Sequence, residues 1–324
     1  MIIMKKILSA SLAFILIALT FTGCMFLNFT EQQTVNFYVD GKLYTKASVD
    51  YGDAVIEPPC PDKAYHVFTG WYSGDLRFNF ATPIIANLNL YAHFTLDAEA
   101  ATERISETAA KSTVTVLNKS YNSSMGGFIE TESQTSQGSG VVIDISGGWC
   151  YVLTNYHVIA KEEGFANQTI SVEDPWGNKF DARIYKHRNL TEEAANESYD
   201  LALICFQYDT AKLKYSLCEI ELGEDPKDGD SIISLGTPEG MKNFLTCGEI
   251  IMYQKVNTEE NDAMDFEAIV HSAIINHGSS GGPLVDPYGR LVGLNFAGSE
   301  SLTYGCAIPI SKINEFLDIY VYVD

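Results

Sequence analysis

A serine with glycine on both sides is the feature that most restricts the fold of this chain. Ser280 lies in the run Gly278-Ser279-Ser280-Gly281-Gly282. Glycine has no Cβ, so a turn built from it is uncrowded and can aim several backbone N–H groups at one point. That arrangement suits a nucleophile that attacks a carbonyl carbon. A serine hydroxyl is a weak nucleophile at neutral pH, so it also needs a base and an acid that orients the base.

Two segments upstream supply candidates for these roles. His157 lies in the run 153–158, which reads LTNYHV, and Asp200 opens the apolar run 200–204, which reads DLALI. An acid at the start of an apolar strand is partly buried, where it can hold an imidazole firmly. We therefore interpret Ser280 as the nucleophile, His157 as the base and Asp200 as the orienting acid.

The order of the three residues along the chain decides between two folds. The spacing G-x-S-x-G also fits α/β-hydrolases, in which a histidine follows the serine. The last histidine of this chain is His277, so none follows Ser280. The order His157, Asp200, Ser280 is that of the chymotrypsin type.

The hydrophobic pattern after residue 112 is also typical of β-structure. Short apolar runs separated by turn residues predict an all-β barrel or sandwich. These expected strands cover residues 140–145, 151–155, 201–206, 231–235, 249–253, 268–275 and 291–296. Only residues 311–318 have a helical period there, with Ile313, Phe316 and Leu317 on one face. The segment 118–139 is rich in Ser, Thr, Asn, Gln and Gly, and composition predicts a loop.

The segment 138–310 resembles trypsin-like bacterial proteases of the high-temperature-requirement (Htr/Deg) type. The motifs that carry the resemblance are GSGV at 138–141, TNYHV at 154–158, DLAL at 200–203, GTP at 236–238, TCG at 246–248, GGPL at 281–284, GLN at 293–295 and AIPI at 307–310. The resemblance implies a mainly β, chymotrypsin-like double β-barrel. It also implies a serine endopeptidase that cleaves polypeptides through an acyl-enzyme and needs no cofactor or metal.

The resemblance assigns further site residues by position. The backbone N–H groups of Gly278 and Ser280 form the oxyanion hole. The strand Phe296-Ala297-Gly298 pairs with the substrate backbone as an added antiparallel strand. Ile274, six residues before the nucleophile, lies at the base of the primary specificity pocket and predicts small or medium apolar residues before the cut.

This chain departs from the family pattern in several places. Ser279 and His277 stand where the family has Asn and Pro. The stretch after Ile310 is too short for a PDZ domain, so none is expected. Residues 118–139 and 298–305 surround the site and need to be ordered before the oxyanion hole forms. The alternative to an active protease is therefore a surface-binding protein with a latent or inactive protease fold.

The first residues predict export. Lys5 and Lys6 precede an apolar run from Ile7 to Phe21. The ending FTGC resembles a bacterial lipobox, with Phe21 in place of the usual Leu, which implies a signal peptide over 1–23 and lipidation at Cys24. The apolar run continues to Leu27, so a membrane-spanning anchor is the alternative. In either case the protein is expected on the bacterial membrane, facing outward.

After a spacer at 24–33, residues 34–96 predict a second β-rich unit. Asp40-Gly41 between alternating runs indicates a hairpin. The opening VNFYVDG, the central FTGWY and the closing TPI with NLNLYA resemble the Listeria–Bacteroides repeat, also called the internalin B-repeat. That resemblance implies a spacer or interaction module that binds a surface ligand. Residues 97–111 predict a linker or short helix, with Leu96, Ala100, Ile105 and Ala109 near a helical period, and 112–324 the protease domain.

Charge and cysteine spacing exclude other classes. The net charge of −21 repels nucleic-acid phosphates, so no nucleic-acid partner is expected. The seven cysteines include no C-x-x-C pair, so a zinc site is not expected. Cys205, Cys218, Cys247 and Cys306 lie in or beside apolar runs, which predicts small buried side chains.

Overall fold

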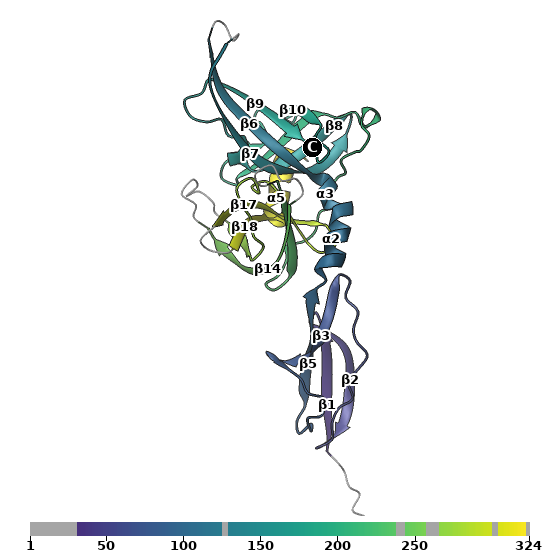
Figure 1. The fold of residues 1–324 in the computed structure, drawn as a ribbon. Coiled ribbons are helices and arrows are strands. Elements are labelled where there is room, and N and C mark those ends of the chain that lie inside the picture. Colours follow the sequence, from purple (N-terminus) through teal and green to yellow (C-terminus); the bar gives the residue numbers. More distant parts are fainter. Residues whose placement is uncertain (1–30, 125–128, 238–243, 257–265, 300–303, 322–324) are drawn as a thin grey trace, which may run out of the picture. The chain divides into compact units, whose positions relative to one another are not determined.

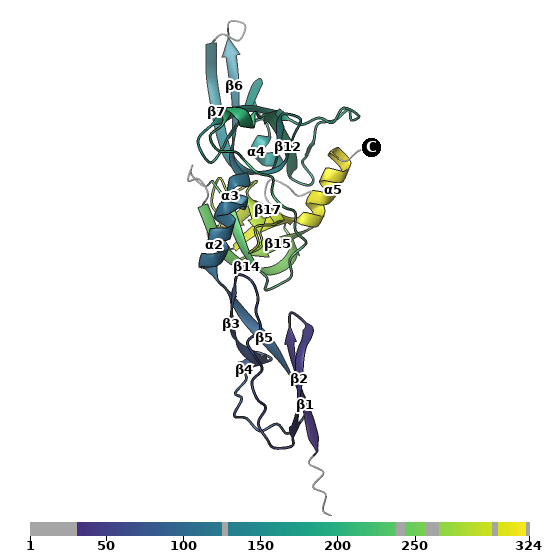
Figure 2. The same ribbon diagram turned by 90° about the vertical axis from the view of Figure 1, so that its right-hand side faces the viewer.

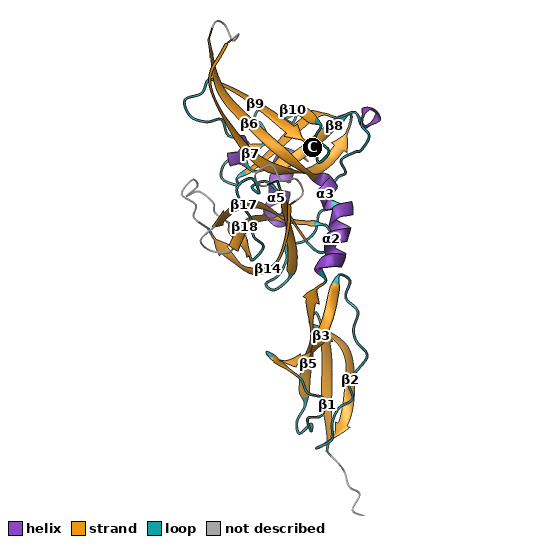
Figure 3. Cartoon of the chain, viewed as in Figure 1, coloured by secondary structure: helices purple, strands orange, loops and turns teal. Residues whose placement is uncertain are grey.

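The computed structural model describes residues 31–124, 129–237, 244–256, 266–299 and 304–321. The chain divides into two units, the first ending at Thr95 and the second beginning at Leu96. Strands are the main regular structure of both units (Figures 1 and 3). The predicted signal peptide and Cys24 lie outside the described residues. Within the described part, no helix is long and apolar enough to cross a membrane.

The N-terminal unit is a five-stranded sheet in the order β2-β1-β5-β3-β4. Its strands are β1 Gln32–Val39, β2 Lys42–Asp50, β3 His66–Ser73, β4 Leu76–Arg77 and β5 Leu88–Leu96. The predicted hairpin joins β1 to β2, where Asp40 and Gly41 have φ values of 47° and 74°. Such positive values at both central positions characterise a tight hairpin turn.

Aromatic side chains fill the core of this unit. Phe37 and Trp71 are buried and meet edge to face, with ring centroids 4.9 Å apart. Leu90 of the central strand β5 is fully buried beside them. The aromatic residues of this segment therefore supply the core of a small sheet.

Two short helices open the second unit. α2 spans Ala98–Glu107 and α3 spans Ala109–Ser112. The Asp97 carboxylate accepts a hydrogen bond from the N–H of Ala100, which caps α2. The buried face of α2 consists of Ala101 and Ile105, so the helix expected at 97–111 is present but turns Ala101 inward rather than Ala100.

The first barrel of the second unit closes through six antiparallel strands, in the order β10-β9-β6-β7-β8-β12, with β10 pairing back to β12. Its strands are β6 Thr113–Ser124, β7 Ile129–Ser146, β8 Trp149–Thr154, β9 Asn167–Glu173, β10 Lys179–Ile184 and β12 Leu201–Gln207, with the short β11 Ala195–Asn196 added beside β12. Val116, Val152 and Phe206 lie in its core. A 3-10 turn, η3, spans Thr210–Lys212.

The expectation of a loop over 118–139 is wrong, because β6 and β7 occupy its described part. The two strands pair antiparallel from Thr113 with Val141 out to Ser124 with Ile129, and β6 also pairs with β9. Figure 2 shows the two strands running beyond the rest of the barrel. Hydrogen bonds between neighbouring strands satisfy the backbone here, and they form whatever the polarity of the side chains.

The second barrel has the closed order β13-β14-β15-β18-β17-β16. Its strands are β13 Ser231–Gly236, β14 Phe244–Lys255, β15 Glu267–His271, β16 Pro283–Val285, β17 Leu291–Ser299 and β18 Tyr304–Pro309. The strand expected over 268–275 therefore ends at His271. Helix α5, Ile310–Tyr320, follows (Figure 2). Its predicted face is buried. The predicted chymotrypsin-like double barrel is confirmed.

The described cysteines are all free. Cys205 and Cys306 are buried, as expected, and Cys218 is half-buried. Cys247 is exposed, so the expectation of a buried side chain is wrong there. It lies on β14, where successive side chains point to opposite faces of the sheet, and an apolar run alone does not say which face a residue takes.

Candidate active site

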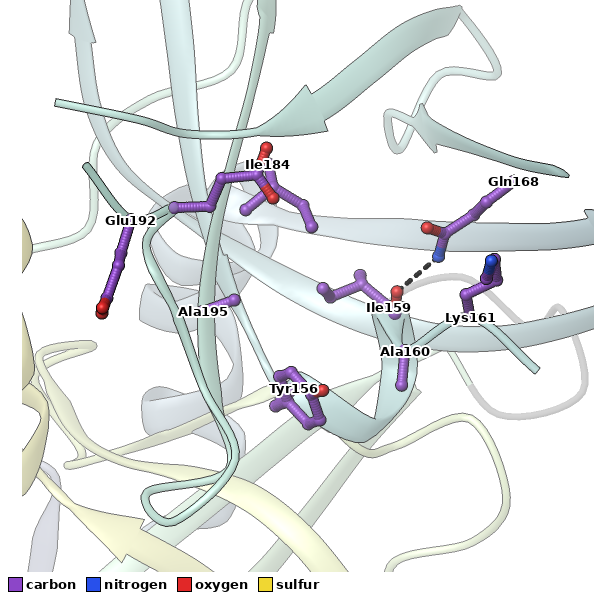
Figure 4. Close-up of a pocket in the computed structure, with 9 residues that line it drawn as sticks. Tyr156, Ile159, Ala160, Lys161, Gln168, Ile184, Glu192 and Ala195 are labelled. Atoms are coloured by element: carbon purple, nitrogen blue, oxygen red, sulfur yellow. Dashed lines mark hydrogen bonds between the residues drawn. The ribbon is translucent and has the colours of Figure 1, made fainter. Parts of the chain in front are cut away.

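His157 lies on a single helical turn directly after a barrel strand. The turn is α4, Tyr156–Ile159, which follows β8. Side chains from two neighbouring strands hold its end. The amide of Asn118 donates to the carbonyl of Ala160 at 2.7 Å. The amide of Gln168 donates to the carbonyl of Ile159 at 2.5 Å (Figure 4). These bonds satisfy carbonyls that a helix end leaves free, and they fix the turn that carries His157.

The same turn borders a cavity of about 390 Å³ (Figure 4). Tyr156 and Ile159 form part of its wall, with Ile184 opposite and Glu192 at its edge. None of His157, Asp200 and Ser280 lines it. The cavity therefore lies beside the helix turn rather than at the proposed catalytic centre.

Both carboxylate oxygens of Asp200 contact His157. Its Oδ1 accepts the backbone N–H of His157 at 2.9 Å, and its Oδ2 lies 2.8 Å from His157 Nδ1. The Asp200 residue is 4% exposed, and its backbone has a φ of 50°. The amide of Asn155 donates to its carbonyl at 3.0 Å. When Nδ1 donates to the carboxylate, Nε2 of the neutral ring carries the lone pair, as a general base requires.

The Ser280 hydroxyl lies on the second barrel. It donates to the carbonyl of Phe296 at 3.3 Å, so it faces the strand that the sequence assigns to the substrate. The carbonyl of Ser280 accepts the N–H of Ser139 at 2.7 Å, which ties the nucleophile loop to the first barrel. The structure thus places the loop of Ser280 between strands of both barrels.

The backbone hydrogen bonds of this loop single out two N–H groups. Ser279 donates to Asn276 and Gly281 donates to Asn295, at 2.9 and 2.8 Å. Among the described residues, no acceptor is recorded for the N–H groups of Gly278 and Ser280. These two are the donors that the family resemblance assigns to the oxyanion hole.

The two residues that depart from the family pattern differ in surroundings. Ser279 is buried, and its hydroxyl accepts the N–H of Asn276 at 3.2 Å. His277 is exposed. The Ser279 hydroxyl therefore contributes to the shape of the loop.

The expected substrate strand 296–298 belongs to β17. On one side, Ala297 and Gly298 pair with Cys306 and Gly305 of β18, after a bulge at Asn295. On the other side, the described pairing with β16 stops at Leu294. Beyond that point, Asn295 bonds to Gly281 and Gly282, and the carbonyl of Phe296 accepts the Ser280 hydroxyl. Among the described residues, no strand pairs with Ala297 and Gly298 on this side, where the resemblance places an added substrate strand.

The side chain that packs against this strand is Ile275. A Cβ built on Gly298 would lie 2.6 Å from Ile275 Cγ1, and one built on Gly305 would lie 3.0 Å from Ile275 Cδ1. Ile274, which the resemblance places at the pocket base, is 59% exposed. Its place at the base stays a prediction, whereas the contacts of Ile275 put it beside the strand. Sequence reasoning missed Ile275, because counting from Ser280 does not give the direction of a side chain in an irregular loop.

A buried histidine lies beneath the same strands. His271 is fully buried, and its Nε2 lies 3.1 Å from Asn295 Oδ1. Burial lowers the pKa of His271 to about 4, against the raising effect of its hydrogen bond to Asn295. The folded state therefore holds a neutral ring at pH values where an exposed histidine is charged.

This burial predicts a loss of stability in mild acid. The unfolded chain takes up a proton near pH 6.5 and the folded chain only near pH 4. Protonation of this group therefore does not reduce the free energy of unfolding above pH 6.5. It lowers that free energy by about 3 kcal/mol as the pH drops to 4. Chemical denaturation of wild type and His271→Gln between pH 4 and 7 measures it. We expect the steeper pH dependence in wild type, and equal slopes would contradict the assignment.

Two antiparallel six-stranded barrels, with a His–Asp pair on one and a glycine-flanked serine on the other, define the chymotrypsin-like class of protein. Residues 138–294 match the trypsin-like peptidase domain, and residues 34–93 match the Listeria-Bacteroides repeat domain. The chain therefore contains a trypsin-like peptidase domain preceded by a domain of that repeat type.

Curated relatives agree with the peptidase match. The chain is 32% identical to serine protease HTRA1 of Xenopus tropicalis over 195 residues, which is 59% of this chain and 37% of the relative. It is 33% identical to protease Do-like 5, chloroplastic, of Arabidopsis thaliana over 188 residues, which is 54% of each protein. The match thus spans between about a third and about half of the length of these relatives.

Proposed function

We propose that the chain is a serine endopeptidase that cleaves polypeptides through Ser280, His157 and Asp200. The proposal rests on the two contacts of the Asp200 carboxylate with His157, one to the backbone N–H and one to Nδ1 of the ring. The contact to Nδ1 sets the ring tautomer that a general base needs. The N–H groups of Gly278 and Ser280, which have no acceptor in the described part of the chain, supply the second requirement, which is stabilisation of a developing oxyanion.

The reaction follows from these positions. Ser280 Oγ forms a bond to the carbonyl carbon of the substrate as its proton passes to His157 Nε2, and the carbonyl oxygen becomes an oxyanion. His157 then gives that proton to the amine as the C–N bond breaks, which leaves an acyl-enzyme. Water attacks the acyl carbon by the same route and releases the acid. Asp200 stays ionised throughout and stabilises the imidazolium.

Hydrolysis of fluorescently labelled, denatured casein by residues 25–324 tests this activity. We expect cleavage by wild type, and no cleavage by Ser280→Ala prepared in the same way. Equal rates from the two proteins would show that the activity comes from a contaminant or from another residue.

The contacts of Ile275 support a narrow primary pocket. Its side chain occupies the space next to Gly298 and Gly305, so small apolar residues such as Ala and Val fit before the cut. We predict that Ile275→Ala raises kcat/KM for Leu or Phe at that position, relative to Ala, by about tenfold or more. Peptide-library cleavage measures the shift.

Ile274→Ala is the matched control for this prediction, because it removes the same atoms from an exposed neighbour. It is expected to leave the preference unchanged. If the cleavage preference changed in Ile274→Ala and not in Ile275→Ala, the base of the pocket would be Ile274 and not Ile275.

For location, we propose an outward-facing bacterial lipoprotein anchored through Cys24. The basic start, the apolar run and the FTGC ending support this proposal. In a bacterial host, Cys24→Ser is expected to abolish incorporation of an alkyne-labelled fatty acid and to prevent processing after Gly23. Unchanged incorporation would contradict lipidation at Cys24. A wild type that stays on the membrane without incorporation would support the spanning anchor.

A further inference from the structure

We propose that Ser139 is a positioning residue that holds the oxyanion hole in shape from the opposite barrel. The inference rests on the proposed protease activity and extends it to a residue that does not touch the substrate. Ser139 lies on β7 of the first barrel, whereas the N–H donors of the hole lie on the second. Its side chain is fully buried.

The hydroxyl of Ser139 joins three groups of the second barrel. It donates to the carbonyl of Gly278 at 2.6 Å. It accepts the backbone N–H of Thr237 at 2.9 Å, and it lies 3.1 Å from the Thr237 hydroxyl. A hydroxyl has a single hydrogen, and the short distance to Gly278 directs it there. The Gly278 carbonyl therefore receives a hydrogen bond whose donor is itself fixed by Thr237.

The backbone of Ser139 contacts Ser280, the second residue that contributes an N–H group to the hole. Its N–H donates to the carbonyl of Ser280 at 2.7 Å, and its own carbonyl accepts the hydroxyl of Thr154 at 2.7 Å. One residue thus anchors the carbonyls of Gly278 and Ser280. Among the described residues, the N–H groups of these same two residues have no acceptor.

Gly278 needs such an anchor because of its backbone. It has a φ of 93°, a region that glycine enters freely. A glycine can also leave that region at little steric cost, and the peptide group after it can then rotate as a rigid plane. The N–H in that plane belongs to Ser279, which donates to the carbonyl of Asn276. Because the plane joins Gly278 to Ser279, its rotation also shifts the peptide planes on either side, which carry the two N–H groups of the hole. The bond from Ser139 opposes this rotation, because turning the peptide would break it.

Glycines flanking Ser139 explain how the hydroxyl reaches the loop. A Cβ at Gly140 would lie 2.5 Å from Val152 Cγ1, and one at Gly138 would lie 2.7 Å from Val158 and 3.0 Å from the Ser280 carbonyl. A larger residue at position 138 would push β7 away from the nucleophile loop, and one at position 140 would clash with the core of the first barrel. The Gly-Ser-Gly run at 138–140 therefore brings one hydroxyl to the junction of the barrels.

Kinetics of the full chain in mild detergent test the inference. A displacement of about 1 Å at a catalytic group can lower the rate about 10²-fold, and we expect a loss of about this size in kcat for Ser139→Ala. The substrate is a fluorogenic peptide selected on wild type. Labelling by a fluorophosphonate, which also places an oxygen in the hole, is expected to slow by a similar factor.

Two controls separate positioning from general damage. Ser120→Ala removes another fully buried hydroxyl of the first barrel, which accepts the N–H of Glu162, and it is expected to keep the wild-type kcat. Affinity for the intact peptide is measured in the Ser280→Ala background, with and without Ser139→Ala. Equal dissociation constants are expected, because ground-state binding does not use the oxyanion hole.

Several outcomes would overturn the inference. An unchanged kcat in Ser139→Ala does so, and so does a fall in kcat matched by an equal loss of peptide affinity. If Ser139→Ala does not fold, Ser139→Cys keeps the volume with a poor donor and is judged by the same criteria. A folded wild type that neither labels nor cleaves overturns the proposed function and this inference together. A labelled wild type with unchanged variants overturns this inference alone.

Discussion

Replacing Ser280 with alanine is expected to lower turnover by about six orders of magnitude, and replacing His157 by a similar factor. The first change removes the oxygen that forms the acyl-enzyme. The second removes the base that takes the proton of that oxygen. Because the two groups act as a unit, the double variant is expected to be no slower than either single variant.

Initial rates on a fluorogenic peptide, measured at high protein concentration, give these factors. Ser146→Ala is the control, because it removes an exposed hydroxyl of β7 that bonds only its neighbour Asp144 in the described contacts. It is expected to match wild type. A loss of less than about a hundredfold in Ser280→Ala would contradict a covalent role for this serine.

Asp200→Asn is expected to lower turnover by about four orders of magnitude while the protein stays folded. Asparagine tolerates the left-handed backbone that Asp200 adopts, with its φ of 50°. However, its amide has one oxygen, whereas the ring and the backbone of His157 each require an acceptor. If the amide oxygen accepts the backbone N–H, the NH₂ group faces Nδ1, which favours the tautomer with its proton on Nε2. That tautomer cannot accept the proton of Ser280.

Nitrogen-15 NMR of the His157 ring measures this effect directly. We expect the neutral ring to carry its proton on Nδ1 in wild type and on Nε2 in Asp200→Asn. Thermal unfolding of both proteins controls for stability. Turnover within tenfold of wild type in Asp200→Asn would contradict the role of Asp200.

The fold class could be predicted mainly from the order of His157, Asp200 and Ser280 along the chain. The absence of a histidine after Ser280 excluded the α/β-hydrolase order, and the observed double barrel agrees with the alternative. The places of His157 and Asp200 at the ends of apolar strands could be read from local patterns. Their closeness depends on the pairing of β8 with β12, which the family resemblance implied and local patterns did not.

Other features depend on contacts between distant segments. The strands β6 and β7 have the composition of a loop, and their pairing with each other and with β9 cannot be read from that composition. The packing of Ile275 on Gly298 and Gly305 depends on loop geometry, in which a shift of one residue changes the direction of the side chain. The Ser139 hydroxyl belongs to a recognisable motif, yet its target lies in the other barrel. Sequence spacing carries no information about such cross-barrel bonds.

Fluorophosphonate labelling of residues 25–324, followed by mass-spectrometric identification of the modified residue, tests the central claim most directly. A phosphonylated serine forms only where a base, a nucleophile and oxyanion donors meet. We expect one modified residue, Ser280, and no modification in His157→Ala. A well-folded wild type that remains unmodified, or one modified at another serine, would contradict it, and the fold would then be a latent or inactive protease scaffold.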